Sequence, residues 1–264
     1  MRPWFVRSLV AMVVVLGWTS GVLPDALNVS PRRAYLDVGG RSIAIPEPAA
    51  DAERVLPPVP VTTAGNHAFW RATVDGDPVG YDPCRPVRYV VRPDGAPPAG
   101  PQLAREAVAI VSGATGLSFV DAGSTDEEPT ADRDVLQPER YGPGWAPVLI
   151  AWAEETTEHA LAGPVAGLGG SAVVPAARGS GRFLAAGRVV LDSADLTLAL
   201  EEPDGGDRAR AIIVHELAHV VGLDHVDDPA ELMYPETGAR TELGPGDLAG
   251  LAALGQVACE TDLP

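Results

Sequence analysis

The sequence contains no lysine, and its nineteen basic residues, all arginine, stand against 36 aspartates and glutamates. The formal net charge is therefore −17 at neutral pH. A chain this acidic has no electrostatic attraction for nucleic acid or anionic lipid, so nucleic acid is excluded as a partner. We interpret the negative charge as a solubility feature, with calcium binding and selection of basic substrates as the alternatives.

Cysteine is also scarce, because only Cys84 and Cys259 occur. In an exported protein an even pair of cysteines predicts a disulfide, which here would close a loop of roughly 175 residues. The rival interpretation makes Cys84 a thiolate that caps a metal ion and keeps the protein latent.

The sequence has few long apolar runs, and the one at the N-terminus carries a targeting signal. Two arginines precede an apolar run from Leu9 to Leu16 that extends loosely to Leu23, the pattern of a secretory signal. No clean small-x-small cleavage site follows. Residues 1–23 are thus either a cleaved signal peptide or a signal anchor, with residues 8–23 as a membrane tether that is short for a full span. Both alternatives predict export, with the protein secreted or anchored at the outer face of the cell membrane.

The composition divides the remainder of the chain in two. Residues 24–65 are rich in proline, small residues and charge, which predicts an extended linker or stalk, with a short propeptide as the alternative. No internal repeat is evident. Residues 66–264 are long enough to bury a substantial core as one catalytic domain.

Hydrophobic periodicity within this domain predicts an α/β sandwich. The predicted strands and helices alternate first, and helices close the chain, which favours a mixed sheet with helices packed on it. Residues 121–141 are predicted to be an acidic surface loop. The expected elements are strands at 87–91, 117–120 and 148–152, a hairpin of 171–174 with 183–191, and helices over about 102–112 and 208–221.

Three of the five histidines fall in one short motif. His215 and His219 stand four residues apart on the predicted helix, so they are rotated by about 40° and separated by about 6 Å on the same face. Glu216 is displaced around the helix and can stand beside a metal as a base instead of a ligand. Gly222 lets the helix stop and the chain turn back, which brings His225 to the same ion.

Three histidine ligands leave the fourth position of a zinc ion open for water, as in catalytic sites. Zinc lowers the pKa of bound water towards about 7. We expect Glu216 to accept the proton of this water as it attacks a peptide carbonyl, and then to deliver that proton to the leaving amine. The motif therefore predicts a zinc-dependent endopeptidase with one catalytic zinc ion.

The full spacing His-Glu-x-x-His-x-x-Gly-x-x-His, with Met233 in Leu-Met-Tyr-Pro eight residues after His225, resembles the matrixin-type metallopeptidases of the metzincin clan. The resemblance covers about residues 66–255 and is sharp only over 215–235. It implies a zincin-type α/β (α+β) fold: a mixed, mostly parallel sheet with an antiparallel edge strand, packed by a crossover helix, an active-site helix and a C-terminal helix. It also places Met233 in a Met-turn that lies beneath the zinc. Tyr234 and Pro235 would then form the wall of the pocket for the substrate side chain after the scissile bond.

The same resemblance implies how substrate binds. An extended protein or peptide substrate would pair with the edge strand of the sheet, for which residues 171–174 are the best candidate. The closing helix is expected at 244–254, with Leu248, Leu251 and Leu254 at core spacing. The protein is expected to be a monomer.

The sequence departs from the family pattern at two points. No cysteine-switch propeptide precedes the domain, since Cys84 lies inside it. A second, structural zinc site is not expected, because only His67 and His159 remain and they lie far apart in the sequence. One group of acidic residues has two interpretations, a solvated surface loop or a calcium site. These residues are Asp121, Asp126, Glu127 and Glu128.

Two other classes of function remain open at this point. One is a catalytically inactive zinc-binding module at the cell surface, against which the intact Glu216 argues. The other is a stalk or adhesion protein whose metal is structural. An exchangeable water on the zinc would separate an enzyme from that last class, because a closed four-ligand site has none.

Overall fold

The computed structural model describes residues 34–49, 53–236 and 240–263. The predicted signal peptide or anchor at 1–23 lies outside the described residues, as do residues 24–33 of the predicted linker. Among the helices that are described, none combines the length and the apolar character needed to cross a bilayer.

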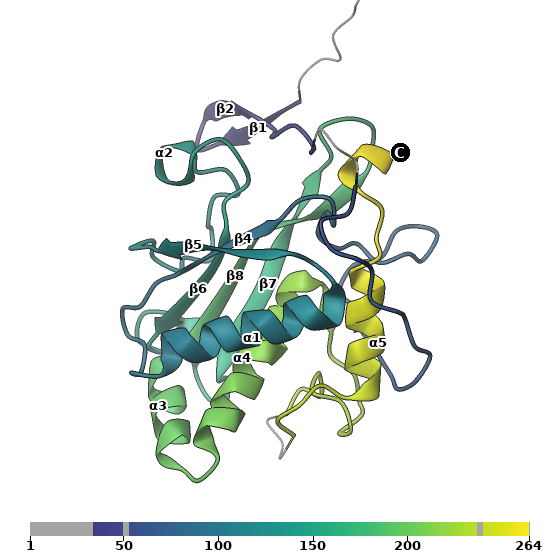
Figure 1. Ribbon diagram of the computed structural model, residues 1–264. Coiled ribbons are helices and arrows are strands. Elements are labelled where there is room, and N and C mark those ends of the chain that lie inside the picture. The colour runs from purple at the N-terminus through teal and green to yellow at the C-terminus, as the bar shows by residue number, and fades with distance from the viewer. Residues whose placement is uncertain (1–33, 50–52, 237–239, 264) are drawn as a thin grey trace, which may run out of the picture. The chain divides into compact units, whose positions relative to one another are not determined.

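A five-stranded sheet forms the centre of the fold (Figure 1). Neighbouring strands are parallel except for the last pair, β8 and β7, which is antiparallel. The structure thus confirms the expected mixed, mostly parallel sheet with an antiparallel edge strand. In spatial order the strands are β5 (Phe119–Ser124), β4 (Val87–Val91), β6 (Val148–Ala153), β8 (Arg182–Asp192) and β7 (Gly167–Pro175).

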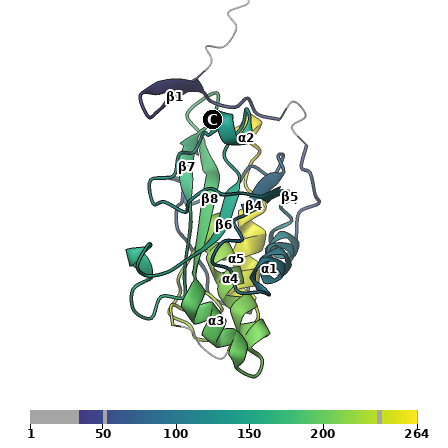
Figure 2. The same ribbon diagram turned by 90° about the vertical axis from the view of Figure 1, so that its left-hand side faces the viewer.

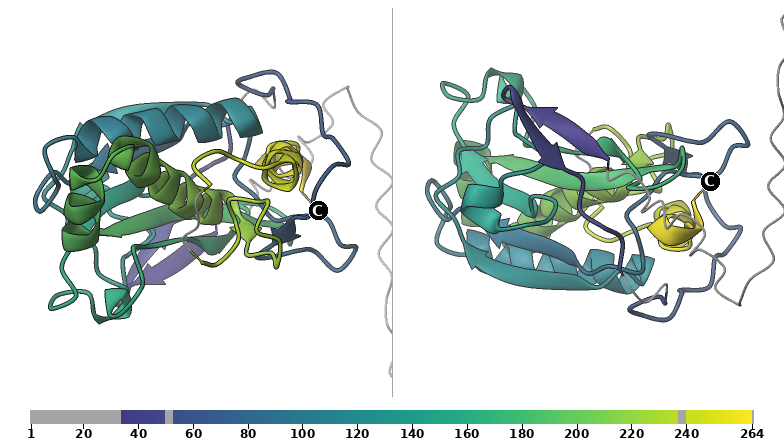
Figure 3. Two further views of the ribbon diagram at one scale, coloured as in Figure 1. Left: turned by 90° about the horizontal axis from the view of Figure 1, so that it is seen from below. Right: turned by 90° about the horizontal axis from the view of Figure 1, so that it is seen from above.

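Two long helices, α1 (Gly100–Thr115) and α4 (Gly205–Val221), cover one face of this sheet (Figure 2). The C-terminal helix α5 (Pro245–Leu254) packs beside α1 and is viewed almost end-on in Figure 3. Side chains alternate along the strands, so Val87, Tyr89 and Val91 join the core under the helices, whereas Val90 faces the other side.

Shorter elements complete the described chain. Helix α3 (Ser193–Glu201) follows β8, where the Asp192 side chain accepts a hydrogen bond from the backbone N–H of Asp195 at 2.8 Å and caps the helix. The remaining elements are β1 (Tyr35–Val38), β2 (Arg41–Ala44), β3 (Ala68–Phe69), α2 (Pro138–Tyr141), β9 (Leu223–Asp224) and the 3-10 helices η1 (His159–Leu161) and η2 (Glu260–Asp262).

The bounds of α1 differ from the prediction of 102–112. The helix passes through Gly113, around which a side chain would meet open space, and ends only at Gly116. Gly116 adopts φ +70° and donates its N–H to the carbonyl of Ser112 at 2.8 Å, which satisfies the helix end. On this helix Ile110 is 38% exposed, because it falls on the flank of the buried face.

The closing helix matches its predicted range, and two of its three predicted core leucines are buried. Leu251 and Leu254 are fully buried, but Leu248 is 45% exposed, so its core assignment is wrong. Leu248 lies on the solvent-facing side of α5, between the buried Asp247 and Ala249.

The acidic stretch 121–141 is not a solvated loop throughout. Its first four residues extend β5 and its last four form α2. Between them, Glu127 and Arg133 form a buried ion pair, with Arg133 Nε 2.8 Å from Glu127 Oε1 and Nη2 2.9 Å from Oε2. Arg133 also donates to the carbonyl of Pro147 at 2.8 Å, next to β6. This pair therefore ties the stretch to the sheet.

The four acidic side chains considered for calcium each contact an arginine instead. Because a guanidinium already neutralises each carboxylate, calcium binding there is not supported, and the metal-capable side-chain groups within the described chain do not include them. The pairs are Asp121 with Arg105, Asp126 with Arg140, Glu127 with Arg133 and Glu128 with Arg92.

The described part of residues 24–65 contacts the rest of the fold. Ile45 is only 2% exposed. Further along, Arg54 donates to the carbonyl of Gly255 at 2.6 Å, and Gln256 donates to the carbonyl of Val59 at 2.5 Å. This segment therefore packs against the chain just beyond α5.

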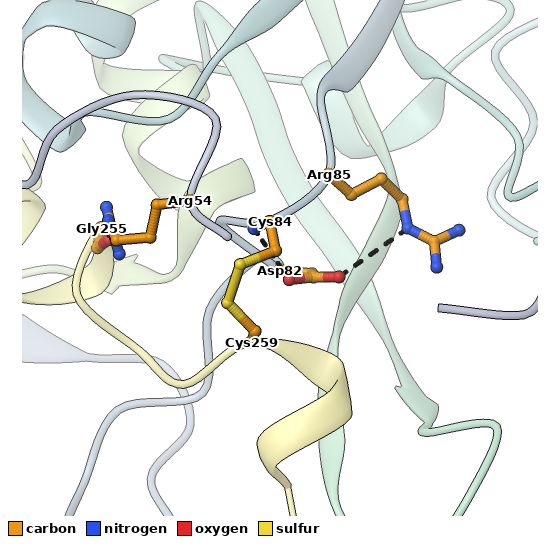
Figure 4. Close-up of a disulfide and its surroundings, with 6 residues drawn as sticks. All are labelled: Arg54, Asp82, Cys84, Arg85, Gly255 and Cys259. Carbon is orange, nitrogen blue, oxygen red and sulfur yellow. Dashed lines mark hydrogen bonds and ion pairs between the residues drawn. A yellow bond between two sulfur atoms is a disulfide. The ribbon is translucent and has the colours of Figure 1, made fainter. Parts of the chain in front are cut away.

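A disulfide joins Cys84 to Cys259 beside these contacts (Figure 4). The Asp82 side chain accepts a hydrogen bond from the Cys84 N–H at 2.9 Å, and Arg85 pairs with the carboxylate of Glu260 at 2.9 Å. Since both sulfurs are bonded, Cys84 has no thiolate to cap a metal, which rules out the alternative assigned to it.

We predict that Arg133→Ala lowers the free energy of unfolding by about 3–5 kcal/mol, because it leaves the buried Glu127 carboxylate without its counter-charge. Chemical denaturation measures the change. The matched control is Arg140→Ala in the exposed pair with Asp126, which should cause a much smaller loss. Equal losses in the two variants would contradict a special role for the buried pair.

Replacing both cysteines by serine should lower the free energy of unfolding by on the order of 5 kcal/mol in the chain-entropy account, because the bridge closes a loop spanning 175 residues. Denaturant titrations of the oxidised protein and the Cys84→Ser/Cys259→Ser variant test this. A difference near zero would mean that the bridge adds nothing to stability.

Candidate metal centre

Three histidine side chains converge at the C-terminal half of α4. The Nε2 atom of His215 lies 3.2 Å from that of His219 and 3.1 Å from that of His225, and the last two are 3.1 Å apart. The three ring nitrogens predicted from the sequence thus form one small triangle.

The other ring nitrogens of two of these histidines fix their tautomers. His215 Nδ1 lies 2.7 Å from the carbonyl oxygen of Leu232, and His219 Nδ1 lies 2.9 Å from that of Leu223. A carbonyl only accepts, so both Nδ1 atoms carry the proton and both Nε2 atoms present lone pairs to the centre of the triangle. Burial, followed by the neighbouring His219, lowers the pKa of His215 to about 4, and burial likewise lowers the pKa of His219. Neutral imidazole, the form that binds metals, therefore prevails at neutral pH.

The geometry of the triangle fits a zinc ion. Tetrahedral bonds of about 2.0–2.1 Å place neighbouring ligand atoms about 3.3–3.4 Å apart, close to the 3.1–3.2 Å between these nitrogens. Facing lone pairs at this distance repel one another unless a cation lies among them. A donor set of three imidazoles is that of zinc sites with one open position.

Glu216 follows the first ligand and is buried, with 7% of its surface exposed. Burial raises the pKa of its carboxyl to about 8. Strand β7 crosses α4 against this residue: a Cβ at Gly167 would lie 2.8 Å from Glu216 Cγ, and one at Gly169 would overlap the Glu216 backbone oxygen. The edge strand reaches the helix here because these two positions lack side chains.

A sharp turn at Gly222 brings His225 back to the helix. Gly222 has φ +120°, and a Cβ there would lie 2.9 Å from Leu254 Cδ2 and 3.1 Å from the carbonyl oxygen of Val79. Glycine meets both the conformational and the spatial requirement. The chain then forms β9, which pairs antiparallel with β3 from the N-terminal part of the domain, a contact that periodicity did not predict.

Met233 lies beside this centre in the segment that follows His225. Its side chain is 1% exposed, and its carbonyl accepts a hydrogen bond from Val226, the residue after His225, at 3.1 Å. The carbonyl of Leu232, its neighbour, is the acceptor for His215. The predicted Met-turn segment is thus joined to two of the three ligand positions.

Two buried carboxylates that the sequence reasoning missed hold the Met-turn segment. Asp247 accepts N–H bonds from Leu232 at 2.5 Å and from Met233 at 3.2 Å, and Glu231 accepts the N–H bonds of Gly246 and Asp247 at 2.9 and 3.0 Å. Each segment therefore caps the backbone of the other. An acidic residue in the first turn of a predicted helix was the available signal for Asp247.

A pocket with a volume of about 540 Å³ opens beside the histidines. Tyr234 and Pro235 are among the residues that line it. Of β7, residues 167–169 line the pocket. The predicted substrate edge, 171–174, lies further along the same strand, so the part of the edge next to the metal site comes four residues earlier than expected.

The two remaining histidines lie outside the centre. His159 Nδ1 is 3.0 Å from the carbonyl oxygen of Glu155, and His67 is exposed with its ring 5.2 Å from that of Phe69. Neither belongs to a metal-capable group of side chains in the described parts of the chain.

We predict that the purified chain binds one zinc ion and that His219→Ala weakens zinc affinity by more than about 100-fold. Loss of a group that only orients a metal ligand already lowers metal affinity by about 10- to 100-fold, and this substitution removes a ligand itself. Metal analysis after dialysis and competition titration with a chelator give the stoichiometry and the affinity. His159→Ala, the control, should bind as the wild type does, and undiminished binding by His219→Ala would refute the site.

The comparison with known families agrees with this geometry. Residues 146–254, from the start of β6 to the end of α5, match the family model described as Matrixin. A search of curated proteins found no match to the chain. The match includes all three histidines, Glu216 and the Met-turn segment. The chain therefore carries a matrixin-like metallopeptidase domain of the metzincin clan.

Proposed function

We propose that the chain is a zinc-dependent endopeptidase in which His215, His219 and His225 hold the metal and Glu216 is the general base. The observation that carries this proposal is the convergence of three histidine ring nitrogens, 3.1–3.2 Å apart, next to a buried carboxylate. Its position beside the edge strand of a sheet gives an extended peptide a place to bind.

Zinc bound at the three nitrogens would supply a Lewis acid that activates water and polarises the scissile carbonyl. Glu216 takes up the proton of the attacking water and passes it to the leaving amine. Burial favours the protonated carboxyl, whereas a zinc ion bound at the neighbouring histidines would favour the ionised form. These opposed effects suit a group that must first accept a proton and then release it.

The substrate would bind as an extended strand along Gly167–Gly169 of β7. In this arrangement its carbonyl groups approach the histidines, and the side chain after the scissile bond enters the pocket walled by Tyr234 and Pro235. The backbone of β7 offers main-chain hydrogen bonds that do not depend on sequence, so the pocket carries the selectivity.

We further propose that the enzyme acts outside the cell, secreted or tethered through its N-terminal segment. The disulfide between Cys84 and Cys259 supports export, because such bonds persist in oxidising compartments. We also propose that the enzyme is a monomer.

Glu216→Gln should lower kcat by about 10²–10⁴-fold, the usual contribution of general acid–base catalysis, while zinc content is retained. Mass spectrometry of a peptide library digested with and without chelator measures cleavage. Glu201→Gln, at an exposed residue of α3, is the matched control and should cleave normally. A zinc-loaded wild type that cleaves no peptide would point instead to a binding module without turnover.

A further inference from the structure

The wall of the pocket includes one face of α4 that extends well beyond the metal ligands. Arg208, Ala211, Ile212 and His215 all line the pocket, and their spacing of three and four residues places them on one side of the helix. Seven residues separate Arg208 from His215, or about 10 Å along the axis. Arg208 therefore marks the end of the pocket that is remote from the metal.

The guanidinium of Arg208 is not committed to another charge. It is exposed, and among the described residues no carboxylate lies within ion-pair distance of it. Arg210, two residues on, differs in this respect, because it pairs with Asp207 at 2.5 Å and with Glu106 at 3.6 Å. Of these two arginines on the same helix, only Arg208 lines the pocket.

Three acidic side chains share the pocket wall with Arg208, and among the described residues none of them forms an ion pair with it. Glu216 stands at the metal end of the helix face. Glu231 is 2% exposed and accepts two backbone N–H bonds at the start of α5. Glu236 and Arg240 also line the pocket and are exposed, and Arg240 donates to the carbonyl of Glu242 at 3.5 Å. Arg208 therefore presents, at the end of the pocket remote from the metal site, a positive charge that no described carboxylate pairs with.

The side chain at residue 211 leaves this end of the pocket accessible. Ala211 stands between Arg208 and His215 on the lining face and extends only a methyl group into the pocket. A long substrate side chain that enters near the histidines can pass it toward the guanidinium. Glutamate, one methylene longer than aspartate, reaches further and matches the planar fork of an arginine with its carboxylate.

We propose that Arg208 selects substrates with glutamate immediately after the scissile bond, so that the substrate class is peptides with a long acidic side chain at that position. This inference rests on the proposed function, since it assigns the selectivity of the same site. Arg208 contacts the substrate side chain and takes no part in bond cleavage.

The test compares matched peptides that carry glutamate, glutamine, aspartate or lysine after the scissile bond. The wild type should cleave the glutamate peptide with a kcat/KM about fivefold or more above that of the glutamine peptide, as for a partly solvated charge pair. Arg208→Gln should abolish this ratio, and Arg208→Glu should reverse it in favour of lysine. Arg210→Gln, the matched control on the same helix, should keep the wild-type ratio.

A binding measurement separates failure of this inference from failure of the proposed function. Zinc-loaded Glu216→Gln protein is titrated with the glutamate and glutamine peptides, with and without Arg208→Gln. A glutamate preference that depends on Arg208 supports the inference even if the wild type cleaves nothing, a result that would defeat the endopeptidase proposal alone. Equal kcat/KM and equal affinity for the two peptides would overturn the role of Arg208.

Discussion

Three imidazole Nε2 atoms lie 3.1–3.2 Å from one another, a distance at which facing lone pairs repel, and the surrounding structure supplies the groups that keep the rings together. Two of the rings are oriented by backbone carbonyls, those of Leu232 and Leu223. Leu232 is in turn held by the buried carboxylate of Asp247 on α5. The ligand set thus depends on a chain of hydrogen bonds that links α4, the Met-turn segment and the C-terminal helix.

The faces of helix α4 contact different parts of the molecule. One face packs under the sheet, another carries the two ligands, and Glu216 lies where strand β7 crosses the helix. The proposed selectivity residue, Arg208, stands two turns earlier on the ligand side. The proposed metal binding, proton transfer and choice of substrate would therefore be fixed relative to one another by a single rigid element.

The metal motif could be predicted from the sequence because its geometry is local. Helical spacing places His215 and His219 on one face, and Gly222 can adopt the positive φ that the turn requires. The burial of Glu127 could not be foreseen in the same way, since an acidic loop residue shows no sign of a buried arginine partner until the chain is folded. The pairing of β3 with β9 likewise joins segments about 150 residues apart in the sequence. Hydrophobic periodicity is a local signal and does not indicate which distant segments pair.

The β3–β9 ladder joins only two residues on each strand, Ala68 and Phe69 with Leu223 and Asp224. His225 follows this ladder directly and is exposed, whereas the other two ligands belong to a helix of 17 residues. Local opening is easiest where few backbone bonds must break. If His225 binds the metal as proposed, it would be the ligand that detaches most easily, and the ion would then stay on the two helical histidines.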